Sequence, residues 1–279
     1  MHVLREALAK FLEEDIGKGD ITSDIIPNDP VKAKIVCKEK AVIAGLHEAS
    51  MLFEIVGCEV RTLVTEGSFV KPNSAIINIS GNARSILSAE RTVLNVLMRM
   101  SGIATETRKY VDEVRKVNPK MNIACTRKTA PGFRIFDKRA VKVGGGETHR
   151  MRLDDMVLIK DNHLAIVGSA SKAVKLAKEK YGSKNKVEIE MRSLNDAIEA
   201  VNAGADIIML DNLTPKQVRS IVKTLKKKGL RDKVTIEVSG GITHKNVEQY
   251  ATADIDLISI GSLTHSVRAI DMSLELTIP

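Results

Sequence analysis

The sequence contains no tryptophan, and only 3% of its 279 residues are aromatic. Proteins that bind single-stranded nucleic acids without sequence preference stack the bases on aromatic side chains, so this composition argues against that class. No apolar run is long enough to span a membrane, and the N-terminus lacks the cationic stretch and apolar core of a signal peptide. The three cysteines, Cys37, Cys58 and Cys125, are scattered without CxxC spacing. We therefore expect no disulfide framework, no membrane segment and a cytoplasmic location.

Several catalytic signatures are also missing from the sequence. No Cys/His cluster has the spacing of a zinc site, and no Gly-x-Ser-x-Gly motif indicates a serine hydrolase. The glycine-rich segment GGGETHR (144–150) lacks the Gly-Lys-Ser/Thr ending of a P-loop, and no GxGxxG motif opens a helix. These absences argue against zinc, serine-hydrolase and P-loop chemistry. They favour an enzyme that acts by positioning its substrates and by electrostatics.

The formal net charge is +8, with 43% hydrophobic and 28% charged residues. This balance is typical of a soluble globular protein. The one long basic run, KTLKKKG (223–229), is interpreted as the solvated last turn of a helix, where cations complement the helix dipole. The excess of positive charge also favours an enzyme whose substrates are anions, because it attracts them to the site.

The pattern up to about residue 104 predicts a mixed α/β domain. Two segments, 31–45 and 59–80, contain strand-like runs separated by Gly- and Pro-containing turns. Residues 85–102 predict a buried helix that is capped by Ser85 and ends near Gly102. The N-terminal residues predict an amphipathic helix with these apolar residues on one face: Val3, Leu4, Leu8, Phe11 and Leu12.

From about residue 120 the pattern becomes a strand–helix repeat. Near-continuous aliphatic runs are typical of parallel strands that are covered on both faces. Ser193, Thr214 and Thr243 are the expected helix N-caps, and Thr214 is followed by a proline at the first helical position. Repeated βα units form either a barrel or a doubly wound sheet. The expected strands are MNIACT, MVLIK, VEIE, DIIML, VTIEV and DLISI, and the expected helices are 165–180, 194–203, 215–228 and 244–251.

Charged or glycine-containing residues follow each of these strands. Barrel enzymes place the active site at the carboxyl ends of their strands, and the last two strands often supply a phosphate site. We therefore favour a barrel over a doubly wound sheet, and we expect VSGGI and IGS at the last two strand ends to bind a phosphate through backbone N–H groups. The residues expected at the rim are Arg127, Lys128, His149, Arg150, Lys160, Glu190 and Asp211.

These groups have complementary chemistry. Arg binds carboxylates and phosphates bidentately, and Lys acts as a point charge. The carboxylates Glu190 and Asp211 can hold Mg²⁺, bind ribose hydroxyls or stabilise a developing positive charge. The sequence therefore predicts an enzyme that acts on a phosphorylated sugar and a polyanionic second substrate.

Several specific motifs occur along nearly the whole chain, in this order: EDIGKGDITSD, AERTVLN, CTRKTAPGFR, KVGGGETHRMRLDDMVLIKDNH, IEMRSLNDA, MLDNL, VSGGI and IGSLTHS. In these motifs the chain resembles the quinolinate phosphoribosyltransferase family. The resemblance implies a reaction of quinolinate with phosphoribosyl pyrophosphate, dependent on Mg²⁺, that gives nicotinate mononucleotide, pyrophosphate and CO₂. It also implies an N-terminal α/β sandwich domain (1–104, with 266–279 returning to it) and an incomplete TIM-like α/β barrel (105–265).

The resemblance assigns roles to individual residues. It implies catalytic roles for Lys128, Lys160, Glu190 and Asp211. The residues implied for quinolinate are Arg127, His149, Arg150 and Lys160, with Arg91 donated by the neighbouring subunit. Those implied for phosphoribosyl pyrophosphate are Lys128, Thr129, Glu190, Asp211, Ser239, Gly240, Gly241, Ile260, Gly261 and Ser262. Glu190 and Asp211 are the implied metal-binding residues, directly or indirectly.

The resemblance further implies a homodimer with a shared active site, which can assemble into a hexamer. The main alternative is a related phosphoribosyltransferase with the same barrel and a different aromatic acid, such as nicotinate. That acid has one carboxylate, and the many cations argue against it. A basic nucleic-acid-binding protein is disfavoured by the lack of aromatics. In this interpretation Gly144–Gly146 give the backbone freedom to direct His149 and Arg150 towards the acid substrate.

Overall fold

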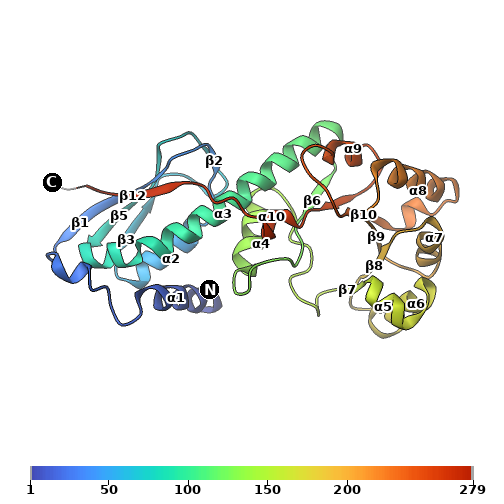
Figure 1. Ribbon diagram of the computed structural model, residues 1–279, viewed down its shortest axis with the longest axis horizontal. Helices are drawn as coiled ribbons and strands as arrows, with labels where there is room; N and C mark the ends of the chain where they lie inside the picture. The colour runs from blue at the N-terminus through green and yellow to red at the C-terminus, as the bar shows by residue number, and fades with distance from the viewer. Residues whose placement is uncertain (1, 278–279) are drawn as a thin grey trace. The chain divides into compact units, whose positions relative to one another are not determined.

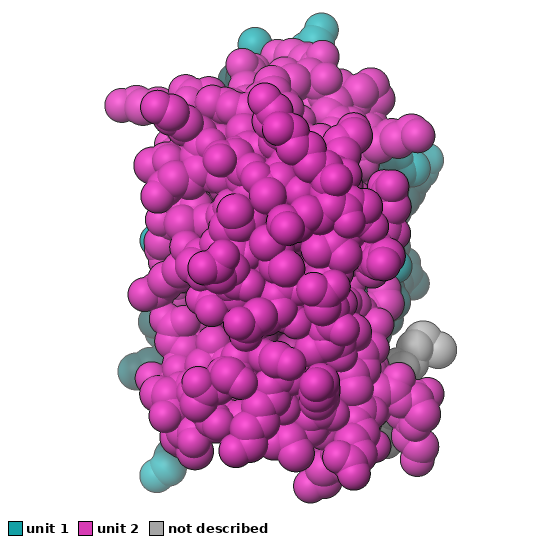
Figure 2. Space-filling model, turned by 90° about the vertical axis from the view of Figure 1, so that its right-hand side faces the viewer, with its two compact units in different colours: residues 1–108, 130–144, 266–279 teal, residues 109–129, 145–265 magenta. Residues whose placement is uncertain are grey.

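The computed structural model describes residues 2–277 and contains two compact units, drawn in Figure 1 and coloured separately in Figure 2. The first unit is built from the residues up to Arg108, from Ala130–Gly144 and from Ser266 onward. The second unit is built from Lys109–Thr129 and Gly145–His265. A mixed α/β fold with a barrel-like parallel sheet was predicted from the strand–helix repeat, and the structure confirms it.

The first unit is organised around a four-stranded antiparallel sheet of order β12-β1-β5-β3. A short ladder of β2 with β4 lies beside it, and α2 packs against β3 (Figure 1). The C-terminal strand reaches this sheet by pairing with β1, from Lys32 opposite Thr277 to Cys37 opposite Met272. The strands are β1 (Pro30–Cys37), β2 (Ala41–Val42), β3 (Glu59–Thr62), β4 (Phe69–Val70), β5 (Ser74–Asn82) and β12 (Met272–Thr277).

The helices of this unit are α1 (His2–Ile16), α2 (Leu46–Ile55), the start of α3 (Ala83–Val117) and α4 (Arg134–Val143), with a 3₁₀ turn at Ser23–Ile25. The expected apolar face of α1 is only partly correct, because Leu8 and Leu12 are buried whereas Val3 is exposed. Helix α4 belongs to this unit, although the sequence analysis placed its residues in the barrel. Phe133, next to α4, stacks on Phe11 of α1 with ring centroids 4.9 Å apart, and this aromatic contact accounts for the placement.

The prediction that the third helix is capped by Ser85 and ends near Gly102 was wrong. Helix α3 starts at Ala83, where the Asn82 Oδ1 accepts a hydrogen bond from the Arg84 N–H, and it continues to Val117. A Cβ atom at Gly102 would lie 2.1 Å from the carbonyl oxygen of Arg268. This glycine therefore permits the close approach of a backbone segment and does not end the helix.

The second unit contains a six-stranded parallel sheet of order β6-β11-β10-β9-β8-β7. All six strands were predicted. Strands β6 and β7 end the order without pairing with each other, so the barrel is incomplete. Helices α6 and α7 pack on strands β7–β9, and Figure 1 shows α6, α7 and α8 along the outer side of the sheet. The strands are β6 (Asn122–Ala124), β7 (Val157–Ile159), β8 (Val187–Met191), β9 (Ile207–Asp211), β10 (Thr235–Ser239) and β11 (Leu257–Ser259).

Two of the predicted helix N-caps in this unit are confirmed by the structure. The Ser193 hydroxyl accepts from the Asp196 N–H, and Thr214 forms a capping box with Gln217, both as predicted. The expected helix 165–180 is divided at Gly168, which has φ +100°. The helices of this unit are α5 (Asp161–Val167), α6 (Ala170–Tyr181), α7 (Leu194–Asn202), α8 (Pro215–Lys227), α9 (Val247–Ala251) and α10 (Ser262–His265), with a 3₁₀ turn at Arg231–Lys233.

Thr243 is not the helix cap that the sequence indicated. Helix α9 begins four residues later, at Val247. The Asn246 side chain accepts from the Thr243 N–H and donates to the Gly241 carbonyl, so these residues form a side-chain-stabilised turn before the helix. Such local bonds compete with helix formation. Within residues 2–277, no helix combines the length and the apolar character that crossing a membrane requires.

Candidate active site

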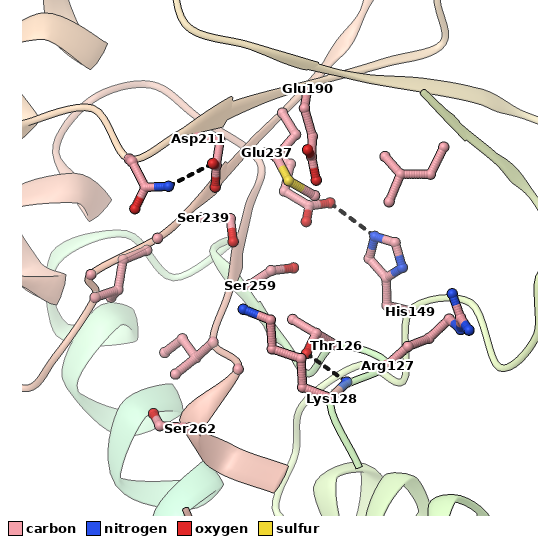
Figure 3. Close-up of a pocket in the computed structure, with 18 of the residues that line it drawn as sticks. Thr126, Arg127, Lys128, His149, Glu190, Asp211, Glu237, Ser239, Ser259 and Ser262 are labelled. Carbon is pink, nitrogen blue, oxygen red and sulfur yellow. Dashed lines mark hydrogen bonds and ion pairs between the residues drawn. The ribbon is translucent and has the colours of Figure 1, made fainter. Parts of the chain in front are cut away.

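A cavity of about 720 Å³ lies at the carboxyl ends of the parallel strands of the second unit (Figure 3). Each strand contributes to its wall or is followed by a residue that does. Of the residues proposed from the sequence, the cavity brings together Arg127, Lys128, His149, Arg150, Lys160, Glu190, Asp211, Ser239, Gly240, Gly241, Ile260, Gly261 and Ser262. Thr129 does not line it. Arg91 lies exposed on α3 in the first unit.

One wall of the cavity carries three cations. The buried Nε of Arg127 has no hydrogen-bond partner among the described residues. Arg150 donates through Nη1 to the Met156 carbonyl oxygen at 3.2 Å. Burial, and then the nearby charge of Arg127, lower the pKa of the Arg150 guanidinium. Lys160 contacts Glu190 and is about half exposed. Two guanidiniums that repel each other in this way favour an anion between them.

The cavity also carries the carboxylates Glu190 and Asp211, whose side chains are only 14% and 17% exposed. Asp211 accepts from Asn212 Nδ2 at 2.6 Å, and Arg192 lies 3.8 Å away. Each carboxylate therefore faces a cation or an amide donor, which orients it. Carboxylate oxygens are the ligands that Mg²⁺ prefers, so this pair is suited to an ion that arrives with a phosphorylated substrate.

The loop after β10 has an unusual backbone. Gly240 and Gly241 both have positive φ values, +91° and +64°, which L side chains rarely adopt. A Cβ atom at Gly240 would lie 2.3 Å from Asn212 Oδ1, so only glycine fits between β10 and the loop after β9. The loop after β11 also lies close to Lys128, but less tightly, since a Cβ atom at Gly261 would lie 3.3 Å from Lys128 Cδ.

Backbone N–H groups are not equally available in these loops. The Ile260 N–H donates to the Ala124 carbonyl at 2.9 Å, so it is already used in the sheet. Of the implied phosphate contacts, Ile260 can therefore contribute only packing. The hydroxyls of Ser239 and Ser262 and the glycine backbone remain the groups that can face an anion (Figure 3).

The GGGETHR segment needs glycine at two positions, one for close packing and one for a positive φ. Gly145 has φ +94°, whereas Gly144 has φ −67° and ends α4. A Cβ atom at Gly144 would lie 2.6 Å from the Ala104 carbonyl oxygen. His149 itself adopts φ +51°, which is uncommon for a residue with a side chain. The left-handed conformation of His149 is separate from that of Gly145, because Glu147 between them forms a bridge to Ala124, and the sequence did not indicate it.

His149 lines the cavity, but its ring points to the barrel interior. Its Nε2 lies 3.3 Å from a carboxylate oxygen of Glu188. It also lies 3.3 Å from one of Glu237, a contact that Figure 3 shows. Both glutamates are completely buried. Neither glutamate was predicted from the sequence, although a charged residue inside an apolar parallel strand, as in VEIEM and TIEVS, is a usable signal. Asn212 and Arg192, which contact Asp211, were not predicted either.

Comparison with known proteins connects this geometry to one family. A family model described as quinolinate phosphoribosyl transferase, C-terminal domain, matches residues 103–275, and the model of its N-terminal domain matches residues 20–101. A protein of Archaeoglobus fulgidus named probable nicotinate-nucleotide pyrophosphorylase [carboxylating] is 47% identical over 92% of this chain and 98% of its own.

A nicotinate-nucleotide pyrophosphorylase [carboxylating] of Rattus norvegicus is 38% identical over 95% of this chain and 88% of its own. The solved structure of the nicotinate-nucleotide pyrophosphorylase from Francisella tularensis superposes with a TM-score of 0.92 at 36% identity, and the match covers 99% of this chain and 96% of that one. The chain therefore belongs to the quinolinate phosphoribosyltransferase family.

Proposed function

We propose that this protein transfers the phosphoribosyl group of phosphoribosyl pyrophosphate to quinolinate and removes one carboxylate, giving nicotinate mononucleotide, pyrophosphate and CO₂. This reaction provides nicotinate mononucleotide for NAD biosynthesis. The names of its relatives support the proposal. The observation that carries it is the wall of three cations, Arg127, Arg150 and Lys160, in a cavity whose other loops offer serine hydroxyls and glycine backbone.

Arg127, Arg150 and Lys160 are proposed to bind the two quinolinate carboxylates. The unpartnered Nε of Arg127 supplies a buried donor, and the mutual repulsion of the two guanidiniums is relieved when a dianion enters. A bound acid also competes with Glu190 for Lys160. An acid with one carboxylate, such as nicotinate, leaves part of this positive charge uncompensated.

The remaining groups are proposed to bind the sugar donor. Gly240, Gly241 and Gly261, with Ser239 and Ser262, offer hydroxyl and backbone groups to the 5′-phosphate. Lys128 lies against Gly261 and can reach the pyrophosphate. Glu190 and Asp211 face the ribose, where they can accept hydrogen bonds from its hydroxyls or bind Mg²⁺. Bound Mg²⁺ would neutralise part of the charge on the leaving pyrophosphate.

The chemistry needs accurate placement more than a strong nucleophile in the protein. The bond from the anomeric carbon to pyrophosphate breaks as the quinolinate nitrogen forms its bond to that carbon. Glu190 and Asp211 stabilise the positive charge that develops on the ribose, and the cationic wall holds the pyridine ring for attack. The bond to the adjacent carboxylate then breaks, its electron pair is stabilised by the pyridinium ring, and a solvent proton replaces CO₂.

The proposal is tested by incubating the protein with phosphoribosyl pyrophosphate and Mg²⁺, together with either quinolinate or nicotinate. We expect nicotinate mononucleotide and CO₂ in equal amounts with quinolinate, and at least a hundredfold lower kcat/KM with nicotinate because one carboxylate is missing. Chromatography of the nucleotide and release of labelled CO₂ measure both. Turnover of nicotinate with no reaction of quinolinate would mean that this protein is the alternative phosphoribosyltransferase.

We also propose that the enzyme works in the cytoplasm as a homodimer in which Arg91 enters the partner's active site. The three cysteines are free and buried, as suits a reducing compartment. The exposed position of Arg91 on α3 is compatible with an intersubunit role.

Subunit mixing tests the role of Arg91. An Arg91→Ala chain and an Arg127→Ala chain should each be nearly inactive alone, whereas their heterodimer should regain up to about half of the wild-type activity, since one of its two sites is then intact. Purification with two different affinity tags isolates the heterodimer. Absence of recovery in verified heterodimers would show that the site is not shared.

A further inference from the structure

The buried cluster of His149, Glu188 and Glu237 has no role in the mechanism described above. Glu188 is on β8 and Glu237 on β10, and a carboxylate oxygen of each lies 3.3 Å from His149 Nε2. Glu237 also lines the cavity. Both are completely buried, and the imidazole is only 9% exposed. Within residues 2–277, none of their four carboxylate oxygens forms a hydrogen bond of good geometry. The basic side chain in contact with both is His149. Burying two acidic side chains beside an anion site costs free energy of folding. Their presence there therefore suggests a function.

The other side of the imidazole is also in use. The backbone N–H of Arg150 donates to His149 Nδ1 at 2.8 Å. Burial disfavours the charged ring, but the two carboxylates together favour it more strongly and would raise the pKa of His149 to about 9. The Arg150 N–H opposes this, because it occupies the nitrogen that a second proton needs. We therefore assign the neutral ring with its proton on Nε2, directed towards the glutamates.

This arrangement connects the barrel interior to the substrate wall. The left-handed conformation of His149 is strained for a non-glycine residue, and contacts on both ring nitrogens can maintain it. The same backbone turn sets the direction of Arg150, whose guanidinium is held at its far end by the Met156 carbonyl. Loss of the glutamate contacts would free the ring and with it the turn that presents Arg150.

We propose that Glu188 and Glu237 are positioning residues: they hold the His149 ring, and His149 in turn fixes the backbone that presents Arg150 to a substrate carboxylate. His149 thus acts within the protein and not as a direct ligand of the acid. This inference rests on the proposed function, because it assigns the cluster to the binding of quinolinate.

The first test uses Glu237→Gln, which keeps the shape of the side chain and removes its charge. We expect the KM for quinolinate to rise about tenfold, because the weakened contact no longer holds the His149 ring and the Arg150 backbone beside it. The KM for phosphoribosyl pyrophosphate should change less than about twofold. Glu188→Gln should behave in the same way. Glu199→Gln is the matched control, because it removes one exposed negative charge from the same unit.

The second test asks whether the effect passes through Arg150. In an Arg150→Ala background, Glu237→Gln should cause no further increase in the KM for quinolinate. An equal increase in both backgrounds would show that His149 contacts the substrate itself and would overturn the proposal. Equal changes in both KM values, or a lower melting temperature with unchanged KM values, would assign the cluster a purely structural role.

Metal analysis of the purified protein excludes a different explanation. His149, Glu188 and Glu237 bring one potential ligand atom each to within 4.8 Å of one another. One equivalent of tightly bound metal in the wild type that is lost in Glu237→Gln would overturn the proposal, whereas we expect none. If the wild type does not turn over quinolinate at all, the proposed function fails. If it does and the variants match it, only this inference fails.

Discussion

Replacement of Arg127 by alanine is expected to raise the KM for quinolinate by two to three orders of magnitude, roughly the effect of losing two charge-assisted hydrogen bonds. The KM for phosphoribosyl pyrophosphate should change less than about threefold. The reason is the location of the guanidinium on the cationic wall of the cavity, with a buried Nε that has no partner in residues 2–277. Steady-state kinetics with each substrate varied in turn measure both constants.

Two further variants make this prediction specific. Arg127→Lys keeps the positive charge but loses the bidentate geometry, so its KM for quinolinate should lie between those of the wild type and of Arg127→Ala. Arg152→Ala is the matched control, because Arg152 is in the same unit and is 71% exposed. It should have wild-type constants. Equal losses for both substrates in Arg127→Ala would place Arg127 outside the quinolinate site.

The second large effect concerns stability. Gly102→Ala is expected to lower the free energy of unfolding by about 1–3 kcal/mol, as overpacking does when backbone atoms must move. The new Cβ atom would lie 2.1 Å from the Arg268 carbonyl oxygen. The Ile270 N–H donates to the Met98 carbonyl at 3.0 Å nearby, and this bond holds the two segments together. Neither backbone can move away without loss of that contact.

The sign of the effect distinguishes this explanation from a simple helix argument. In an ordinary helix interior, Gly→Ala stabilises a protein by up to about 1 kcal/mol. Asn95→Ala, at an exposed position on the same helix, is the control and should leave the stability unchanged or slightly higher. Urea denaturation of the three proteins gives the comparison. A stabilised Gly102→Ala protein would show that the Arg268 segment does not constrain α3.

Position along the chain was sufficient to predict much of the site. Parallel strands bring their carboxyl ends to one edge of the sheet, so residues that follow them, such as Lys160, Glu190 and Asp211, share a cavity once the strands are recognised. Ser193 and Thr214 were predictable as caps because an N-cap bonds to a backbone group three residues away.

The failed predictions depended on contacts between distant residues. From the sequence alone, Gly102 is expected to end a helix. In the structure it lies inside α3 and permits the close approach of the Arg268 carbonyl. Thr243 has the residue type of a cap, yet the Asn246 side chain bonds back to the loop and delays α9. Glu188 and Glu237 lie on different strands, and nothing local shows that both face His149.

The sequence by itself determined the order of strands and helices and the family motifs, because apolar periodicity, glycines and capping side chains act over a few residues. It also determined which chemical groups follow each strand. Only the tertiary structure decided how these groups are used: which cation contacts which acid, and where His149 directs its ring. Pairing of this kind joins residues that are tens of positions apart, so it depends on the packing of the whole sheet.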